Sequence, residues 1–339
     1  HLYDAYYKGE NAVKEISSFP RLHLAQLPTP LHHLPNISAL VGKNVYVKRD
    51  DLTGVVLGGN KVRKLEFLLA DALDRGCDTI LTTGGAQSNH AMLTAACCGR
   101  MGLNSILVLK KRGIWEKKGN QLLNDILGAD VRFVDTDSYD DVYAEMKRIS
   151  AELRAKGHNP YCVPVGGSVP LGSLGYALCV QEAKEQATAL GLAFDDIVCC
   201  TGSGGTMAGM VLGTMLYAPA TRVTGIVVDP EDFAPIVADL VNGAQELLQC
   251  SARISPEDVN LYDCYGTGYA IPSAAGVAAL RLMAQQEGLI LDPVYTGKTF
   301  AGFLELCEQG YFDESENILF LHSGGAGGLF AIDLEQTEG

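Results

Sequence analysis

Residues 197–209 read Ile-Val-Cys-Cys-Thr-Gly-Ser-Gly-Gly-Thr-Met-Ala-Gly. An apolar run here passes through a glycine-rich turn into a segment of helical length (205–217), the pattern of a strand, a loop and a helix. Such a loop directs several backbone N–H groups and a helix N-terminus toward one point, so it suits the phosphate of a small ligand. The turn lacks the lysine of a nucleoside-triphosphate loop and departs from G-x-G-x-x-G, although Asp229 lies near the spacing of a ribose-binding acid.

The same alternation of short apolar runs and longer amphipathic segments continues along the chain. We expect strands at residues 45–47, 79–82, 105–109, 131–134, 197–200, 223–228 and 317–321. We expect helices at residues 61–75, 90–101, 119–127, 172–190, 205–217, 273–286 and 299–309. Strands separated by helices of this length form βαβ units with parallel sheets, so the predicted fold class is α/β. Because 339 residues exceed what one core usually serves, we expect two domains, with a crossing between them at residues 159–170.

Composition and charge exclude several classes of protein. Apolar residues make up 47% of the chain and charged residues 19%, so the chain has the means to bury a large core. The net charge of −14 would repel phosphate backbones and argues against a nucleic-acid partner. No apolar run is long enough to span a membrane, and the polar segment 1–10 has no signal-peptide character. The ten cysteines show neither C-x-x-C nor zinc spacing, so we expect no metal and buried free thiols in a reducing cytoplasm.

A second glycine-rich segment, residues 57–66, places a lysine where a lysine is unusual. Lys61 directly follows a Gly-Gly-Asn turn, at the start of a predicted helix, where its charge opposes the helix dipole. Either Lys61 is solvated there by chance, or its pKa is lowered. A lysine with a lowered pKa is nucleophilic and can form a Schiff base with an aldehyde.

Three more strand ends carry polar residues. In residues 82–90, Ser88 or Asn89 is either an ordinary helix N-cap or part of a loop that holds a carboxylate. Residues 292–298 form a further polar turn that contains a tyrosine. Residues 322–328 again pass from a strand into a glycine-rich turn, where His322 is more typical of a structural histidine than of a catalyst.

These segments, in this order, resemble the pyridoxal-phosphate enzymes of the tryptophan-synthase-β type (fold type II), specifically the group of D-cysteine desulfhydrase and 1-aminocyclopropane-1-carboxylate (ACC) deaminase. The matching stretches span nearly the whole chain; they are Leu-Pro-Thr-Pro-Leu (27–31), Lys-Arg-Asp-Asp-Leu-Thr-Gly (48–54), Gly-Gly-Asn-Lys-Val-Arg-Lys-Leu-Glu (58–66), Gln-Ser-Asn-His (87–90), Thr-Gly-Ser-Gly-Gly-Thr (201–206), Asp-Pro-Val-Tyr (292–295) and Ser-Gly-Gly (323–325).

The resemblance implies an overall architecture and a set of partners. The expected fold has two domains with three-layer parallel sheets: a large cofactor-binding domain (1–50 and 165–339) and a small domain (51–164), with the active site in the cleft between them. The implied cofactor is pyridoxal 5′-phosphate, the implied substrate is a small amino acid, and the implied assembly is a homodimer.

The resemblance also assigns roles to individual residues. Lys61 matches the lysine that binds the cofactor covalently, and Asn89 matches the residue that bonds the 3′-oxygen of the cofactor ring. Further cofactor contacts are implied for Thr201, Gly202, Ser203, Gly204, Gly205, Thr206 and Ser323. Substrate contacts are implied for Ser88, Asn89, His90, Tyr269 and Tyr295. Lys61, Ser88, Tyr269 and Tyr295 are the implied catalytic residues, with Lys61 or Ser88 removing the Cα proton.

Two positions separate the activities within the group. The ACC deaminases have a glutamate that faces the pyridine nitrogen, and Thr296 stands at that position here. Ser323 stands where the desulfhydrases have a hydroxyl residue that faces the same nitrogen. A hydroxyl leaves the nitrogen largely neutral and the ring a weaker electron sink, which is enough when a good leaving group departs from Cβ. We therefore expect β-elimination from a cysteine-like amino acid, foremost D-cysteine, to pyruvate, ammonia and sulfide.

Several alternatives remain open. The chain reads Ala91-Met92-Leu93 after the Gln-Ser-Asn-His motif, where many desulfhydrases carry an arginine, so the anion environment near the substrate loop differs. This leaves ACC deaminase, L-cysteate sulfo-lyase and 3-chloroalanine dehydrochlorinase as alternatives, with thiolate, sulfite or chloride as the leaving group. A racemase with the same cofactor and a non-catalytic nucleotide-binding module are further possibilities.

Overall fold

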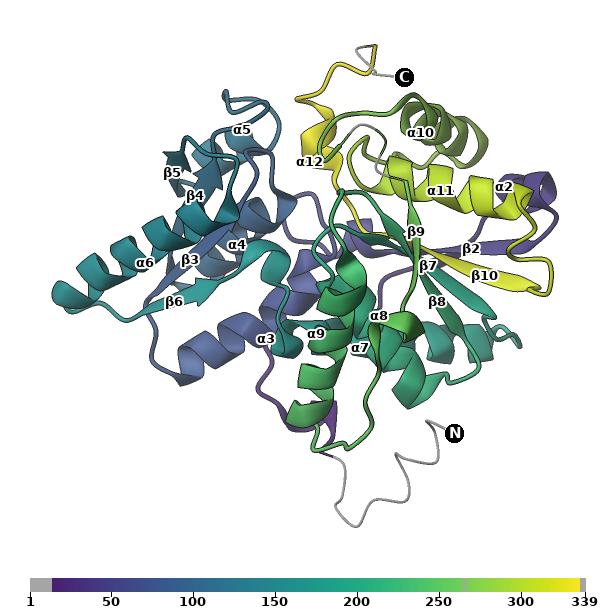
Figure 1. Ribbon diagram of the computed structural model, residues 1–339, viewed down its shortest axis with the longest axis horizontal. Helices are drawn as coiled ribbons and strands as arrows, with labels where there is room; N and C mark the ends of the chain where they lie inside the picture. Colours follow the sequence, from purple (N-terminus) through teal and green to yellow (C-terminus); the bar gives the residue numbers. More distant parts are fainter. Residues whose placement is uncertain (1–13, 265, 267, 336–339) are drawn as a thin grey trace.

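The computed structural model describes residues 14–335 except 265 and 267 (Figure 1). The polar N-terminal segment 1–10 therefore lies outside the described residues. Within them, the strands form two separate sheets, one of six strands and one of four. No described helix combines the length and the apolar content needed to cross a bilayer.

The six-stranded sheet has the order β1-β2-β10-β7-β8-β9. Its strands are β1 (Leu31–His33), β2 (Asn44–Arg49), β7 (Asp196–Thr201), β8 (Arg222–Val227), β9 (Asn260–Asp263) and β10 (Asn317–His322). Every neighbouring pair is parallel except β1 with β2. In the parallel register His322 pairs with Arg49, and Thr201 pairs with Val227, so these strands end close together. The carboxyl ends of five strands thus share one edge of the sheet.

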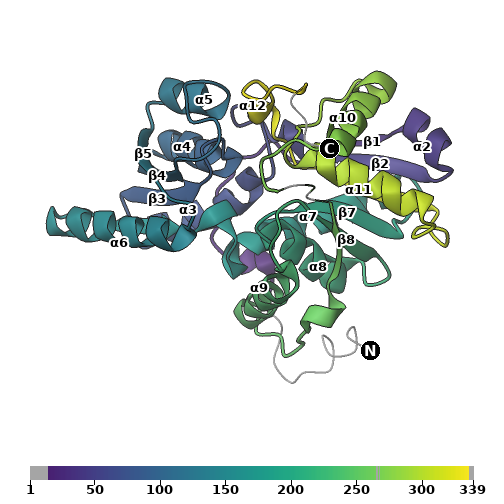
Figure 2. The same cartoon turned by 45° about the horizontal axis from the view of Figure 1, so that its top comes forward.

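Helices cover both faces of this sheet (Figures 1 and 2). One face carries α7 (Pro170–Ala189), α8 (Gly205–Tyr217) and α9 (Phe233–Leu247). The other carries α2 (Pro35–Val41), α10 (Ala274–Glu287) and α11 (Thr296–Glu308). Successive strand residues feed opposite cores, since Val198 packs with α11 and its neighbour Cys199 packs with α7 and α8. Burial on both faces explains why the central strands are continuous apolar runs in the sequence.

The four-stranded sheet is parallel throughout and has the order β5-β4-β3-β6. Its strands are β3 (Thr79–Gly84), β4 (Asn104–Lys110), β5 (Asp130–Val134) and β6 (Pro160–Val163). The associated helices are α3 (Lys61–Asp74), α4 (Asn89–Met101), α5 (Asn120–Ile126) and α6 (Tyr139–Ala155). Alternate residues of β4 face α4 and α6 in turn, which gives this sheet the same three-layer arrangement.

The remaining elements are short. They are the 3₁₀ helices η1 (Ile16–Ser18), η2 (Asp50–Leu52), η3 (Val165–Gly167) and η4 (Pro256–Asp258), and the terminal helix α12 (Ala326–Leu329). All ten cysteines lie among the described residues, and there they form no disulfide. Cys162 is the exposed one.

The α/β class and the parallel sheets predicted from the sequence are confirmed, and each predicted strand and helix is present with ends shifted by a few residues. The sequence reasoning omitted the helices α2, α6, α9 and α12 and the three- or four-residue strands β1, β6 and β9. A signal for α6 was available, since Val142, Met146 and Ile149 are spaced by four and three residues and are all buried. The short strands carry too few residues to show a period of two.

The crossing predicted at residues 159–170 is present. The chain leaves the smaller sheet at the end of β6, forms η3, and enters α7, which packs on the larger sheet. We propose that the two sheets are the cores of the two domains expected from the sequence, with residues 1–50 and 165–339 in the large domain and 51–164 in the small one.

A buried cluster of charges joins the two sheets. Arg63 of α3 donates from Nε to Asp50 Oδ2 at 2.7 Å, and from Nη2 to Glu182 Oε1 of α7 at 3.0 Å. The Tyr176 hydroxyl donates to the same Asp50 oxygen at 2.6 Å, and Lys48 pairs with Glu182. Burial works against ionisation of Asp50, but Arg63 and these hydrogen bonds outweigh it and lower the Asp50 pKa. The cluster therefore fixes α3 against β2 and α7 at Arg63, which lies two residues after Lys61.

We predict that Asp50→Asn lowers the free energy of unfolding by about 3 kcal/mol, because it leaves the buried Arg63 guanidinium without its main counter-charge. Urea unfolding followed by circular dichroism measures the change. Glu152→Gln, which removes a charge from an exposed pair with Arg148, serves as the matched control and should leave the midpoint nearly unchanged. Equal shifts in the two variants would contradict this role of the cluster.

Candidate active site

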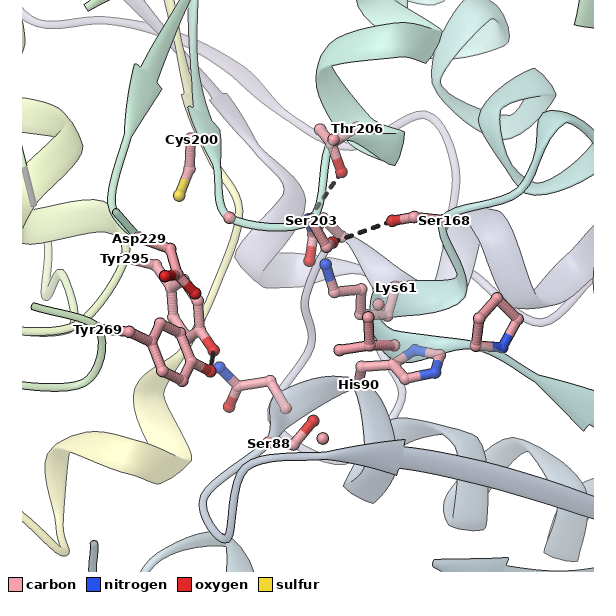
Figure 3. A pocket seen from close by; sticks show the side chains of 18 of the residues that line it. Lys61, Ser88, His90, Ser168, Cys200, Ser203, Thr206, Asp229, Tyr269 and Tyr295 are labelled. Atoms are coloured by element: carbon pink, nitrogen blue, oxygen red, sulfur yellow. Dashed lines mark hydrogen bonds between the residues drawn. The ribbon is translucent and has the colours of Figure 1, made fainter. Parts of the chain in front are cut away.

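A cavity of about 310 Å³ lies where the carboxyl ends of both sheets face each other (Figure 3). Its lining comes from the residues that follow β3, β7, β8 and β10, from the starts of α3 and α4, and from α6 and η3. The described lining residues are Asn60, Lys61, Gly84, Ser88, Asn89, His90, Tyr139, Tyr143, Pro164, Val165, Gly166, Ser168, Cys200, Gly202, Ser203, Gly204, Thr206, Asp229, Glu231, Phe233, Ile236, Tyr269, Tyr295, Ser323 and Gly324.

The glycine-rich turn before α8 offers a place for an anion. The backbone N–H groups of Ser203 and Gly204 donate no hydrogen bond to any described residue, and they stand at the N-terminus of a 13-residue helix. A side chain on Gly205 would not fit, since its Cβ would lie 2.7 Å from Ser168 Oγ and 2.8 Å from Lys64 Nζ. Free N–H groups, a helix N-terminus and a nearby lysine amine together suit a phosphate dianion.

Two other residues of that turn lie away from the cavity surface. Thr201 is buried, and its hydroxyl has no partner among the described residues. Gly205 is also absent from the lining, although its N–H donates to Ser168 Oγ at 3.2 Å. Thr206 does line the cavity, where its hydroxyl accepts from Asn60 Nδ2 at 3.0 Å.

Lys61 is the first residue of α3, and the turn before it requires glycine. Gly58 has φ +73°, and a Cβ there would lie 1.8 Å from the Asp51 carbonyl oxygen. The Asn60 N–H donates to the Ser323 carbonyl at 3.0 Å, which ties this turn to the end of β10. Burial lowers the pKa of Lys61 to about 8, so a useful fraction of the amine is neutral near physiological pH. Of the two interpretations of this lysine, the structure supports the lowered pKa.

The start of α4 brings three predicted site residues to the cavity wall. Ser88 is the N-cap of α4, since its Oγ accepts from the Ala91 N–H at 3.1 Å, and it also lines the cavity. Asn89 lines the cavity while its Oδ1 accepts from Asn120 Nδ2 at 2.7 Å. The N-cap interpretation is therefore correct for Ser88, and the loop still faces the cavity.

His90 is a neutral imidazole with one unused acceptor. Its Nε2 lies 2.8 Å from Thr82 Oγ1, whose own proton is donated to the Val163 carbonyl, so Nε2 carries the ring hydrogen. Burial, helped by Lys61 and Lys64, holds the pKa of His90 well below its usual range. The buried Nδ1 has no partner among the described residues.

Two tyrosines form the opposite wall. The hydroxyls of Tyr269 and Tyr295 share a hydrogen bond, and their ring centroids lie 6.0 Å apart. Burial raises the pKa of Tyr269 to about 12 and raises that of Tyr295 well above its usual range, so both remain protonated at neutral pH.

The two positions expected to distinguish activities differ in orientation. Thr296 is fully buried and does not line the cavity; its hydroxyl donates to Asp292 Oδ1 at 2.8 Å and accepts from the Asp292 N–H. The Asp292 carboxylate also accepts from the N–H groups of Val294 and Tyr295. Ser323 lines the cavity. His322, predicted to be structural, bonds the Ile290 carbonyl through Nε2 and accepts the Gly324 N–H at Nδ1.

Sequence reasoning missed Lys64, although it stands in the quoted motif three residues after Lys61 and thus on the same face of the helix. Its side chain is fully buried, and Nζ donates to the Gly166 carbonyl at 3.1 Å. Burial and the charge of Lys61 lower its pKa well below the usual range. Tyr139, Tyr143, Ser168 and Glu231 also line the cavity without having been predicted, because segments outside the quoted motifs bring them there. Cys200, directly before the glycine-rich turn, was likewise not assigned a role.

Comparisons with known proteins agree with this geometry. A family model described as pyridoxal-phosphate dependent enzyme matches residues 22–324. A putative 1-aminocyclopropane-1-carboxylate deaminase of Pyrococcus abyssi is 42% identical over 326 residues, covering 95% of this chain and 97% of that protein. D-cysteine desulfhydrase of Yersinia pestis is 39% identical over 326 residues, covering 94% and 97%. The crystal structure of an ACC deaminase homologue has a TM-score of 0.87 at 41% identity and covers 93% of this chain and 94% of that one.

We predict that the Lys61 amine is half deprotonated near pH 8, since burial disfavours its charged form. Hydroxylamine treatment and dialysis first remove any cofactor bound to the amine. Reductive methylation of residue 61 is then followed by peptide mass spectrometry at a series of pH values. N-acetyl-lysine in the same tube serves as the reference amine. The Lys61 profile should reach its midpoint about two units below that of the reference, whose pKa is about 10.4. Coincident profiles would contradict the lowered pKa.

Proposed function

Because this chain belongs to the family of pyridoxal-phosphate-dependent enzymes, we propose that its cavity catalyses β-elimination from a cysteine-like amino acid, foremost D-cysteine, to pyruvate, ammonia and hydrogen sulfide. The enzyme is a lyase that uses pyridoxal phosphate. The proposal also includes a cytoplasmic homodimer, as expected from the resemblance.

The cavity residues fit the cofactor. The free N–H groups of Ser203 and Gly204 suit its phosphate, and the buried amine of Lys64 behind them would regain its charge beside a dianion. The partly neutral amine of Lys61 suits its aldehyde, Asn89 suits the ring 3′-oxygen, and Ser323 suits the ring nitrogen. When bound, the cofactor supplies a conjugated ring that withdraws electrons from the Cα of the amino acid.

Lys61 is the better candidate for moving the Cα proton. Its Nζ has a pKa of about 8 and is therefore able both to accept and to return a proton near neutral pH. Ser88 is the other candidate, but its Oγ already accepts the Ala91 N–H and forms no hydrogen bond to a base among the described residues. We assign Ser88 to binding, with the N-terminus of α4 holding the substrate carboxylate.

The observation that carries elimination over ACC deamination concerns position 296. The ACC deaminases have a glutamate there, whereas Thr296 is turned into the Asp292 turn and away from the cavity. Asp292 itself is occupied by three backbone N–H groups and that hydroxyl. Among the described residues, the hydroxyl of Ser323 is thus left to face the ring nitrogen, which favours a substrate with a good leaving group.

ACC deaminase is the second candidate function. Its support is the 42% identity to the putative ACC deaminase of Pyrococcus abyssi, slightly above the 39% to the desulfhydrase. The difference is too small to distinguish the two reactions, and residue 296 argues for elimination.

We predict that Lys64→Met weakens binding of pyridoxal phosphate roughly 10- to 100-fold, because it removes the buried amine beside the glycine-rich turn that we propose holds the phosphate. Equilibrium dialysis with apo-protein measures the dissociation constant. Pyridoxal without its phosphate is the control ligand and should bind both proteins equally. Equal weakening for the two ligands would show that Lys64 supports the fold instead of the phosphate.

We predict that the purified enzyme releases pyruvate and sulfide from D-cysteine and that Lys61→Ala loses this activity by more than about 10⁴-fold, since it removes the cofactor attachment and the proton acceptor together. Lys117→Ala, at an exposed lysine, is the matched control. The panel includes L-cysteine, L-cysteate, 3-chloroalanine and ACC, with assays for sulfide, sulfite, pyruvate and 2-oxobutyrate.

Each other outcome of this panel identifies another reaction. Formation of 2-oxobutyrate from ACC, with no sulfide from cysteine, would favour the deaminase. Loss of optical activity without pyruvate would indicate a racemase.

A further inference from the structure

The charges around the cavity are unevenly distributed. Lys61 is the one cation among the described lining residues. Lys64 lies behind it, next to the glycine-rich turn at residues 201–206, which we call the phosphate turn. The acids of the lining are Asp229 and Glu231, both in the segment that follows β8. Asp229 is half-buried and Glu231 is exposed. Neither carboxylate forms a hydrogen bond or a salt bridge with a described residue, although the charges of Lys110 and Lys298 act on Asp229.

Asp229 faces the tyrosine wall. In Figure 3 its side chain lies beside Tyr295, on the side of the cavity opposite Lys61. The preceding residue, Val228, packs against Gly202, which leaves 3.2 Å between its Cγ2 and a Cβ built on that glycine. Burial raises the pKa of Tyr269, and the charge of Asp229 adds to that effect. The carboxylate is therefore close enough to act on a group bound between the tyrosines and the cofactor turn.

The nearest cations, Lys110 and Lys298, interact with Asp229 electrostatically, but neither lines the cavity. Lys110, from β4 of the other sheet, donates to the Asp137 carbonyl and lies 3.7 Å above the Tyr139 ring. Lys298 donates to the Gly268 carbonyl at 2.8 Å. Position 92, where many desulfhydrases have an arginine, is a methionine packed in the apolar cluster of α3 and α4. No described arginine lines the cavity.

We propose that Asp229, assisted by Glu231, is a specificity-determining residue that admits amino acids with a neutral or cationic β-substituent and excludes those with an anionic one, such as a sulfonate or a phosphate. This inference rests on the proposed function, since it names the substrate class of the same cavity.

The physical reason is electrostatic. The amine and the carboxylate of an amino acid are committed to the Lys61 side and to the α4 N-terminus, which leaves the β-substituent as the part free to face the tyrosines and Asp229. A second anion in a cavity of this size must approach a half-buried carboxylate without an arginine to pair with. A thiol, a chloride or an ammonium meets no such repulsion.

The test uses the holoenzyme with D-cysteine as substrate and both enantiomers of cysteate as competitive inhibitors and as substrates. Asp229→Asn should lower the inhibition constant of cysteate, or raise its kcat/KM, by roughly tenfold relative to D-cysteine. The double variant that carries both Asp229→Asn and Glu231→Gln should show a larger change than Asp229→Asn alone. Serine, a neutral analogue, should inhibit all variants equally, so that a general change in the cavity is distinguished from a change in charge recognition.

Glu308→Gln is the control for net charge, because Glu308 is exposed at the far end of α11, about 18 Å along the helix from Thr296. Glu308→Gln should leave the inhibition by cysteate, and its kcat/KM relative to that of D-cysteine, unchanged. Holoenzyme absorbance and melting temperature verify that each variant folds and retains its cofactor.

Two failures are distinguishable. If no β-substituted amino acid yields pyruvate, the proposed elimination is wrong, whatever Asp229 does. If D-cysteine is converted but the double variant gains neither turnover of cysteate nor inhibition by it, elimination stands and the role of Asp229 is overturned.

Discussion

The Arg63 guanidinium and the Asp50 carboxylate are buried together between the two sheets, and the site depends on that pair. Removing two charges from water is costly, and the cost is offset only because Arg63 reaches both Asp50 and Glu182 while Tyr176 donates to Asp50. These partners come from η2, α3 and α7. The same contacts therefore hold the start of α3 in place, and Lys61 lies two residues before the arginine.

That placement brings two lysine amines toward one glycine-rich turn. Lys61 and Lys64 are one helical turn apart, burial lowers the pKa of both amines, and the charge of Lys61 lowers the pKa of Lys64 further. Opposite them, the N–H groups of Ser203 and Gly204 donate to no described residue. A phosphate dianion would satisfy both needs at once, since it accepts the free N–H groups and supplies the missing counter-charge. The proposed phosphate site thus combines free N–H groups with two desolvated amines.

The cavity has a polarity from one end to the other. Lys61 lies near the glycine-rich turn, and Asp229 and two protonated tyrosines lie on the other side of the cavity (Figure 3). Lys64 lies behind that turn, and Glu231 lines the cavity two residues after Asp229. The phosphate, the aldehyde carbon and the amino-acid substituent would then lie along a gradient from positive to negative. Such a gradient orients the cofactor and discriminates between β-substituents by charge before any close contact is made.

Local sequence patterns determined the α/β class and the order of the central elements, and the family resemblance identified part of the cavity lining, including Lys61, Asn89 and Tyr295. Glycine at positions 58 and 205 is required by backbone geometry and close approach, and such requirements leave a readable mark in the sequence. The N-cap role of Ser88 is equally local. Only the tertiary structure decided that Thr296 turns away from the cavity, that Lys64 lies behind the phosphate turn, and that Asp229 faces the tyrosines. Lys64 lies beside Gly166 and Gly205, more than a hundred residues away in the sequence. The charge of Asp229 acts on Tyr269, 40 residues away, and its side chain lies beside Tyr295, 66 residues away, so these encounters depend on the tertiary fold. Thr296 is held by Asp292, four residues before it, and only the structure shows that this turn keeps its hydroxyl away from the cavity.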